Sequence, residues 1–402
     1  MLPLEDVKIL DFMWALAGPG TTRALADYGA TVVRIESTSR IDGSRTVGPF
    51  YKNKAAHNGS GLFGTYNACK LGLGLDLNNA MAREVVLDLV RWADIVCESF
   101  SPKAMRAWKL DYESLRSVKP DIIMLSSCLM GQTGPMSGFV GFGNMAAAVS
   151  GFYNLCGWPD RSPSGPFGAY TDYLAPRFGA VSILAALDYR RRTGKGQYID
   201  QAQAESALHF LTPALLDCAA NGRVVQGLAN DDLNCAPHGV YPTEGEDRWI
   251  AIACVNDKQW RSLCSVMNRN ELVSDETCAT LSSRLKNRAR LDDVIQKWTA
   301  GLEASEAEKL LQTAGVPAYV VQNSKAVCED EQLASRGYLQ EIDHDIQGKT
   351  VVEGSRFKLS RTPALIPRQA PSVGRDNQYI LERILGYDEA RITELVASGA
   401  LQ

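Results

Sequence analysis

The sequence predicts an α/β protein built around a parallel β-sheet. Over residues 7–129, short apolar runs of strand length alternate with amphipathic runs of helix length. The strand candidates are mostly apolar, as is typical of strands buried on both faces of a sheet. The chain has 402 residues with a hydrophobic content of 45%, which is enough for a large core and more than one domain.

The first β–loop–α–β unit occupies the start of the chain. We predict a buried strand at 7–12, a tight turn at 17–20, a helix at 21–29 and a second strand at 30–36. Because a helix begins at this turn, its backbone N–H groups are available to an anion.

A second unit continues the alternation. We predict a strand at 71–77, a helix at 79–93, a strand at 94–99, a helix at 102–110 and a strand at 121–129. Parallel sheets of this type bind ligands at the carboxyl ends of their strands.

The middle of the chain is less regular. Residues 131–177 contain many Gly and Pro residues and little periodicity, which favours a functional loop region. A helix is predicted at 178–192, a strand-to-helix passage at 197–211 and a linker at 222–236.

The remaining elements predict a smaller α+β domain and a return of the chain. They are a hairpin at 239–254, helices at 257–268, 291–300 and 305–313, a strand within 314–321, and helices near 378–385 and 388–398.

Composition excludes several classes of function. The net charge of −4 gives no general attraction to nucleic acid or anionic membranes. The N-terminus is not a signal peptide, and no apolar run is long enough for a transmembrane helix. The ten cysteines are scattered, with no CxxC pair or His/Cys cluster, which favours reduced core cysteines and no metal site. We therefore expect a cytoplasmic enzyme without a metal.

NAD binding and serine-hydrolase chemistry are both disfavoured. Gly18 and Gly20 lie in the first turn, but Thr21, Thr22 and Arg23 follow where a dinucleotide-binding turn needs its third glycine. None of the four histidines lies in a nucleophile elbow, and the sequence has no GxSxG motif.

Asp172 is the most informative single residue. It is the one ionisable side chain in GPFGAYTDYLAP (165–176), a segment rich in glycine, proline and aromatic residues that precedes an apolar helix. One interpretation is a helix N-cap, and the other is a partly desolvated nucleophile or base. The local sequence favours the cap.

Several longer motifs occur in a fixed order along nearly the whole chain. They are LDFMWALAGPGTTRALADYGATVVRIES (10–37), DGSR (42–45), YNACKLGLGLDL (66–77), ADIVCESFSPKAM (93–105), LDYRRRTGKGQYIDQAQAES (187–206), AGVPAYVV (314–321), DEQLASRGYL (330–339) and APSVGRDNQYIL (370–381).

With these motifs the chain resembles the class III CoA-transferases of the formyl-CoA and carnitine type, the CaiB/BaiF family. The resemblance implies a Rossmann-like large domain assembled from 1–222 and 326–402, with a small α+β domain at 223–325 between them. It also implies an interlocked homodimer of ring-like chains.

The resemblance also implies the site. The family's nucleophilic aspartate falls on Asp172, which would form an acyl anhydride and then a CoA thioester. An arginine common in the family falls on Ala107, one residue after Arg106. The positions implied to contact CoA are Leu16, Ala17, Leu75, Asn78, Ser99, Phe100 and Arg106.

The substrates implied are an acyl-CoA and a carboxylic acid. Residues 141–161 look most like the branch that uses succinyl-CoA with aromatic or branched dicarboxylic acids, in which paired non-identical subunits also occur. Arg161 and Arg177 are candidates to bind a second carboxylate. The alternative is an α-methylacyl-CoA racemase, which shares the fold but needs a histidine where this chain has Phe142.

Overall fold

A computed structural model describes all 402 residues and divides the chain into two compact units. The larger unit contains residues 1–153, 165–225 and 332–402. The smaller unit contains residues 154–164 and 226–331. Each unit has its own β-sheet and core. The assignment of 1–222, 223–325 and 326–402 to functional domains stays a prediction.

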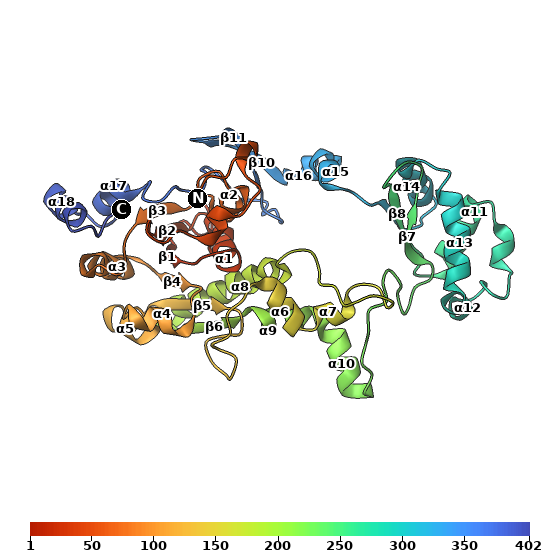
Figure 1. The fold of residues 1–402 in the computed structure, drawn as a ribbon, viewed down its shortest axis with the longest axis horizontal. Helices are drawn as coiled ribbons and strands as arrows, with labels where there is room; N and C mark the ends of the chain where they lie inside the picture. The colour runs from red at the N-terminus through yellow and green to blue at the C-terminus, as the bar shows by residue number, and fades with distance from the viewer. The chain divides into compact units, whose positions relative to one another are not determined.

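A six-stranded parallel sheet forms the centre of the larger unit (Figure 1). The strand order is β3-β2-β1-β4-β5-β6, so the order reverses between β1 and β4, as in a Rossmann fold. The predicted α/β class with a parallel sheet is therefore confirmed. The strands are β1 (Lys8–Phe12), β2 (Thr31–Glu36), β3 (Leu71–Gly74), β4 (Ile95–Glu98), β5 (Ile123–Cys128) and β6 (Tyr198–Ala202).

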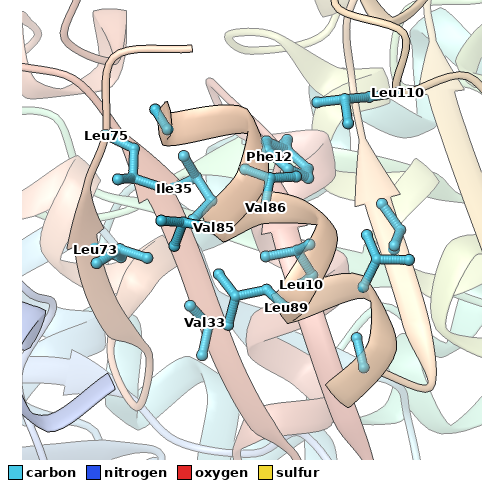
Figure 2. Close-up of a cluster of buried hydrophobic side chains, with 14 of the residues drawn as sticks. Leu10, Phe12, Val33, Ile35, Leu73, Leu75, Val85, Val86, Leu89 and Leu110 are labelled. Carbon is cyan, nitrogen blue, oxygen red and sulfur yellow. The ribbon is translucent and has the colours of Figure 1, made fainter. Parts of the chain in front are cut away.

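Helices cover both faces of this sheet because successive strand residues face opposite sides. Leu10 and Val33 face helix α3 (Ala80–Trp92), which contributes Val85, Val86 and Leu89 to a fully buried cluster (Figure 2). The neighbouring Ile9 and Val32 face α1 (Ala17–Ala26) and α8 (Tyr170–Thr193) on the other side. Burial on both faces explains why the strands are mostly apolar.

The C-terminal segment completes the α3 face of the sheet. Ile380 and Leu381, in a π-helix at Ile380–Ile384, join the same cluster as Leu395 in α18 (Glu389–Ala397). Leu401 then forms a β-bridge with Leu75. The expectation that both chain ends build one Rossmann-like unit is confirmed.

Helix α1 starts earlier than predicted, at Ala17, so the predicted tight turn at 17–20 is wrong. Pro19 lies in the first helical turn, where a missing N–H removes no intrahelical hydrogen bond. The glycines on either side are buried within the helix because another chain segment packs closely there.

Helix α8 also starts earlier than predicted, at Tyr170, although Pro176 lies inside it. Proline has no N–H, so the carbonyl of residue 172 receives no helical hydrogen bond from residue 176. Part of the predicted loop region is also helical, in α6 (Gly143–Val149) and α7 (Phe152–Leu155).

The other elements of the larger unit lie mostly at its periphery. They are α2 (Gly61–Asn67), α4 (Pro102–Ala107), α5 (Tyr112–Val118), α9 (Gln203–Leu208), α10 (Thr212–Asn221), α16 (Glu331–Arg336), α17 (Asn377–Tyr379) and the antiparallel hairpin of β10 (Leu339–His344) and β11 (Gly348–Glu353), together with 3-10 turns at Gly43–Thr46, Tyr51–Asn53 and His209–Leu211.

The smaller unit has a three-stranded antiparallel sheet in the order β7-β8-β9, as the predicted hairpin required. Its helices pack around the buried Trp260. The elements are β7 (His238–Pro242), β8 (Trp249–Ala253), β9 (Ala318–Val320), α11 (Asp257–Val266), α12 (Leu281–Lys286), α13 (Arg288–Thr299), α14 (Ala304–Thr313), α15 (Ser324–Glu329) and a 3-10 turn at Asn270–Val273.

Two further features bear on the sequence predictions. None of the helices combines the length and apolar character needed to span a bilayer. All ten cysteines are free thiols, but only Cys97, Cys254, Cys264 and Cys278 are buried, so core packing does not account for most of them.

Candidate active site

A cavity of about 150 Å³ lies at the carboxyl edge of the large sheet. Its walls come from segments that follow β1, β4, β5 and β6 and from the start of α8. The cavity is thus next to the reversal of strand order, where open α/β sheets bind ligands. The lining residues are Trp14, Ala15, Ala17, Ser99, Phe100, Ser101, Ser127, Cys128, Leu129, Ser137, Phe139, Val140, Gly141, Phe142, Asp172 and Gln203.

Asp172 lies in the first turn of α8 and is held against the start of α6. Its carboxylate accepts a hydrogen bond from the Gly143 backbone N–H, while the Thr171 hydroxyl donates to the Gly143 carbonyl over 3.0 Å. A Cβ atom on Gly143 would lie 2.7 Å from Asp172 Oδ1, so only glycine fits at this position. The N-cap of α8 is Ala169, so the capping interpretation of Asp172 is wrong.

The environment of Asp172 makes its charged form unfavourable. The residue is 6% exposed, and burial raises the pKa of its carboxyl group to about 6, against the opposing hydrogen bond from Gly143. No Lys, Arg or His lines the cavity. At neutral pH Asp172 is therefore ionised but poorly stabilised, which suits a nucleophile or a base.

Four of the residues predicted for the site lie together. Ala17, Ser99 and Phe100 line the same cavity as Asp172. Leu16 precedes them as the N-cap residue of α1 and is buried.

The remaining three predicted residues, like Leu16, do not line the cavity. The Leu75 side chain is buried in the core under α3, so only its main chain is available to a ligand. Asn78 and Arg106 are exposed. Arg106 has no ion-pair partner, and neither do Lys103 and Lys109 on the same segment.

Trp14 is a site residue that sequence reasoning missed. Its ring meets Phe100 edge-on with 5.7 Å between centroids, and Phe100 meets Trp108 in the same way at 5.5 Å. The Arg40 guanidinium lies 5.6 Å from the Trp14 ring centroid. The position of Trp14 just after the first strand was the available signal, because carboxyl ends of strands carry ligand contacts.

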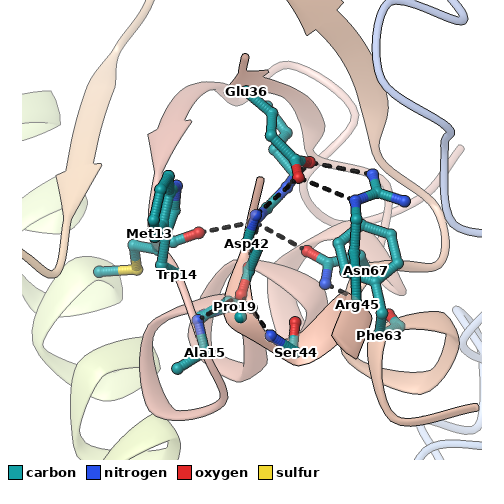
Figure 3. A network of polar contacts seen from close by, with 12 residues as sticks. Met13, Trp14, Ala15, Pro19, Glu36, Asp42, Ser44, Arg45, Phe63 and Asn67 are labelled. Carbon is teal, nitrogen blue, oxygen red and sulfur yellow. Dashed lines mark hydrogen bonds and ion pairs between the residues drawn. The ribbon is translucent and has the colours of Figure 1, made fainter. Parts of the chain in front are cut away.

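A buried network of charges holds the loop that carries Trp14 (Figure 3). Arg34 donates to the Met13 carbonyl over 2.6 Å and pairs with Asp42, also at 2.6 Å. The other Asp42 oxygen accepts the Ala15 N–H over 3.1 Å, where Ala15 has a positive φ of 63°. The network therefore fixes a strained backbone conformation at the edge of the cavity.

A second buried ion pair holds the other end of this loop. Lys70 Nζ lies 3.0 Å from Asp11 Oδ2 and donates to the Pro19 carbonyl over 3.1 Å. Burial lowers the pKa of Lys70 to about 8, although Asp11 acts in the opposite direction. The DGSR (42–45) and YNACK (66–70) motifs thus position the loop and do not line the cavity.

Glu98 is another buried carboxylate near the cavity. One of its oxygens accepts the Phe100 N–H over 2.7 Å, and Ser126 donates to the same side chain. Burial raises the pKa of Glu98 to about 7, against these two hydrogen bonds. Glu98 therefore positions the main chain of two lining residues, Ser99 and Phe100.

This geometry supports covalent catalysis by a single carboxylate. Asp172 is desolvated and is surrounded by neutral groups, and Phe142 at the same cavity carries no exchangeable ring proton. The model for CoA-transferase family III matches residues 4–377. The chain belongs to this family.

Curated relatives and solved structures agree with the assignment. Succinyl-CoA–D-citramalate CoA-transferase of Chloroflexus aurantiacus is 30% identical over 98% of this chain and 97% of its own length. Succinyl-CoA:glutarate CoA-transferase of Mus musculus is 29% identical over all of this chain and 91% of its own. The crystal structure of a CaiB/BaiF family protein from Brucella suis has a TM-score of 0.86 and 29% identity, covering 95% of this chain and 99% of that one.

Proposed function

We propose that this protein moves CoA from an acyl-CoA thioester to a carboxylic acid, with Asp172 as the covalent nucleophile. The observation that carries this proposal is the desolvated Asp172 carboxylate in a cavity without cationic side chains. A carboxylate paired with Lys or Arg would be held in its ionised form and would be a weaker nucleophile.

The reaction proceeds through two acyl transfers on one side chain. Asp172 attacks the thioester carbonyl, the C–S bond breaks, and an aspartyl acyl anhydride and a CoA thiolate form. The thiolate then attacks the aspartyl carbonyl, which releases the donor acid and leaves an enzyme–CoA thioester. The acceptor carboxylate repeats these steps in reverse, so no proton is gained or lost overall.

The surroundings of Asp172 suit this chemistry. The Gly143 N–H fixes one carboxylate oxygen, so the other is available for attack. Backbone N–H groups in this glycine-containing turn are candidates to stabilise the tetrahedral oxyanion. Burial excludes water, which would otherwise hydrolyse the anhydride.

The CoA substrate would extend from this cavity along the sheet edge. Ala17, Ser99 and Phe100 are proposed to contact it near the thioester, and Leu16, Asn78 and the Leu75 main chain farther away. Arg106 is our candidate phosphate ligand in place of the residue at Ala107. Its exposure and lack of an ion-pair partner support this role.

Succinyl-CoA is the proposed donor, because the relatives are named for its use. A carboxylic acid is the acceptor. Neither Arg161 nor Arg177 lines the cavity, so their role toward a second carboxylate stays a prediction. The cytoplasmic location also stays a prediction.

The assembly is proposed to be an interlocked homodimer or a heteromer with a similar subunit. Exposed apolar side chains on the larger unit support an extensive interface. A relative that is 29% identical is named as the beta subunit of succinyl-CoA–L-malate CoA-transferase. The exposed side chains include Val181 and Leu184 on α8, Phe210, and Leu215 and Leu216 on α10.

Asp172→Ala tests the proposal. We expect transfer to fall by about 10⁴-fold or more, because the covalent route is removed. CoA binding by calorimetry should persist, because the lining residues other than Asp172 are unchanged. Treatment of the wild-type protein with succinyl-CoA and then hydroxylamine should modify Asp172, as mapped by peptide mass.

Two outcomes would contradict the proposal. Retained transfer by Asp172→Ala would exclude its role as nucleophile, and labelling of a different residue would move the covalent site. Deuterium uptake from solvent at the α-carbon of an acyl-CoA, without an acceptor acid, would favour the racemase alternative that Phe142 disfavours.

A further inference from the structure

Two buried polar atoms in the cavity with Asp172 have no hydrogen-bond partner in the protein. They are Ser127 Oγ and Gln203 Oε1. Ser127 is 1% exposed and Gln203 9% exposed, so both are at least nine-tenths buried. Buried polar atoms are almost always paired, and leaving one unpaired is unfavourable.

The sheet places these two residues on neighbouring segments of the cavity wall. Ser127 lies opposite Gln201 in the β5–β6 pair, and Cys128 lies opposite Ala202. Gln203 follows Ala202 directly as the first residue of α9. The two side chains are therefore placed by the paired carboxyl ends of adjacent parallel strands.

The alternation of β5 separates Ser127 from its neighbour. Ser126 hydrogen-bonds to Glu98, and successive strand residues point to opposite faces. Ser127 thus lies on the other face, where it lines the cavity. The Ser126 hydroxyl therefore has a hydrogen-bond partner within the protein, whereas the Ser127 hydroxyl has none.

The chemistry of the pair points to a particular ligand group. The Ser127 hydroxyl can donate a hydrogen bond, whereas Gln203 Oε1 can only accept one. A hydroxyl group on the ligand matches both atoms, because its oxygen accepts from Ser127 and its hydrogen is donated to Gln203. A carboxylate cannot donate to Gln203 Oε1, and no cation lines the cavity to neutralise its charge.

We propose that Ser127 and Gln203 form a subsite that recognises a hydroxyl group on the acyl group derived from the acceptor acid, so that the CoA thioester of a hydroxy acid is formed, or used as donor in the reverse direction, in preference to that of the matching plain acid. Succinyl-CoA as donor does not use this subsite. This inference rests on the proposed function for its location next to the reacting carbonyl. A site built to hydrogen-bond a hydroxyl rejects the analogue without it, because its buried polar atoms are then left unpaired.

The test compares matched thioesters. The second-order rate constant kcat/KM is measured for 2-hydroxybutyryl-CoA, 3-hydroxybutyryl-CoA and butyryl-CoA with one acceptor acid. For the wild-type protein we expect the better hydroxyacyl substrate to exceed butyryl-CoA by about 10²-fold or more. Ser127→Ala and Gln203→Leu should each reduce this ratio about tenfold, chiefly through the hydroxylated substrate.

Matched controls separate recognition from general damage. Ser126→Ala changes the adjacent serine on the other face, and Gln369→Leu changes a buried glutamine outside the cavity whose amide is paired with Asp345. Both should leave the substrate ratio unchanged even where they lower stability. Ser127→Thr keeps the hydroxyl and should keep the preference.

Binding to Asp172→Ala tests the subsite independently of turnover. Calorimetry should show tighter binding of the preferred hydroxyacyl-CoA than of butyryl-CoA, and Gln203→Leu in the same background should remove the difference. A wild-type ratio near one, or equal losses for both substrates in the variants, would overturn the subsite. A third result would also overturn it: a preference for succinyl-CoA that depends on Gln203 and is the same with or without a hydroxyl group. The group recognised would then be a carboxylate.

Discussion

The buried carboxylates near one edge of the large sheet differ in how their negative charge is compensated. Glu36 and Asp42 are bound by Arg34 and Arg45. Burial opposes the ionisation of Glu36, but Arg34 and Arg45 outweigh it and hold its pKa below the ordinary value. Asp172 has no such partner, and burial raises its pKa to about 6.

The difference separates structural from reactive carboxylates. The paired group fixes the loop between Met13 and Pro19, where a change of charge would disrupt the backbone. Asp172 without a cationic partner has an ionised carboxylate that is weakly solvated and therefore more reactive. Burial alone therefore does not single out the proposed nucleophile, because both groups are buried. Lack of a cationic partner does not do so either, because Glu98 is also buried without one and its pKa is raised to about 7. Asp172 combines these two features with a place in the lining of the cavity.

Breaking the paired group should have the largest effect on stability. Arg34→Met removes the partner of Asp42 and leaves two buried carboxylates under-compensated. We expect a loss of about 3–5 kcal/mol in the free energy of unfolding, measured by urea denaturation. Arg192→Ala, which breaks an exposed pair with Asp188, is the control and should cost less than about 1 kcal/mol. Similar losses for the two variants would mean that the buried network does not hold the loop.

Neutralising Asp172 should increase the free energy of unfolding, whereas breaking the paired group should decrease it. The folded-state pKa of Asp172 lies above its unfolded value, so ionisation destabilises the fold increasingly as pH rises from about 4 to about 6. Asp172→Asn removes this charge and keeps an oxygen for the Gly143 N–H. We expect a gain of about 1–3 kcal/mol at pH 8 and little gain at pH 4, measured by denaturation at each pH. A variant less stable than wild type at pH 8 would show that the charge of Asp172 is well compensated.

The smallest of the three effects is the pH dependence of transfer. Only ionised Asp172 can attack, so kcat/KM should fall about tenfold for each pH unit below about 6 and level off above it. The profile should be measured between pH 4.5 and 8 with succinyl-CoA, with protein stability followed in parallel. A level rate down to pH 4.5 would place the reactive carboxylate in a better-compensated environment than this structure shows.

Particular residues show how far sequence reasoning reached. The apolar strands and the amphipathic helix 79–93 were correct because burial on one or two faces leaves a direct periodic pattern. Pro19 and Pro176 led to wrong helix starts, because a proline looks like a break in the sequence. Pro19 lies in the first turn of α1 and removes no intrahelical hydrogen bond, whereas α8 continues past Pro176 although one such bond is lost. The hairpin β10–β11 was missed because its strands are largely exposed and contain no apolar run.

The candidate site shows the same division. Asp172, Ala17, Ser99 and Phe100 were predicted and share one cavity, since they follow strands or begin helices at one sheet edge. Ser127 and Gln203 carried no signal, because a serine within an apolar strand and a glutamine at a helix start are ordinary residues. In the folded protein they are distinguished by two features together: each has a buried side-chain atom without a partner, and each lines the cavity that contains Asp172.

The sequence by itself determined the parallel α/β class, the order of the main elements, the family and Asp172 as the residue of interest. These follow from local periodicity and from motifs read along the chain. The tertiary structure decided that Asp172 is no helix cap and that Ser127 and Gln203 line the same cavity. It also decided that no Lys, Arg or His lines the cavity of Asp172, whereas Arg34 and Arg45 pair with Glu36. The reason is physical. Desolvation and hydrogen-bond pairing depend on residues distant in sequence, and only folding brings those residues together.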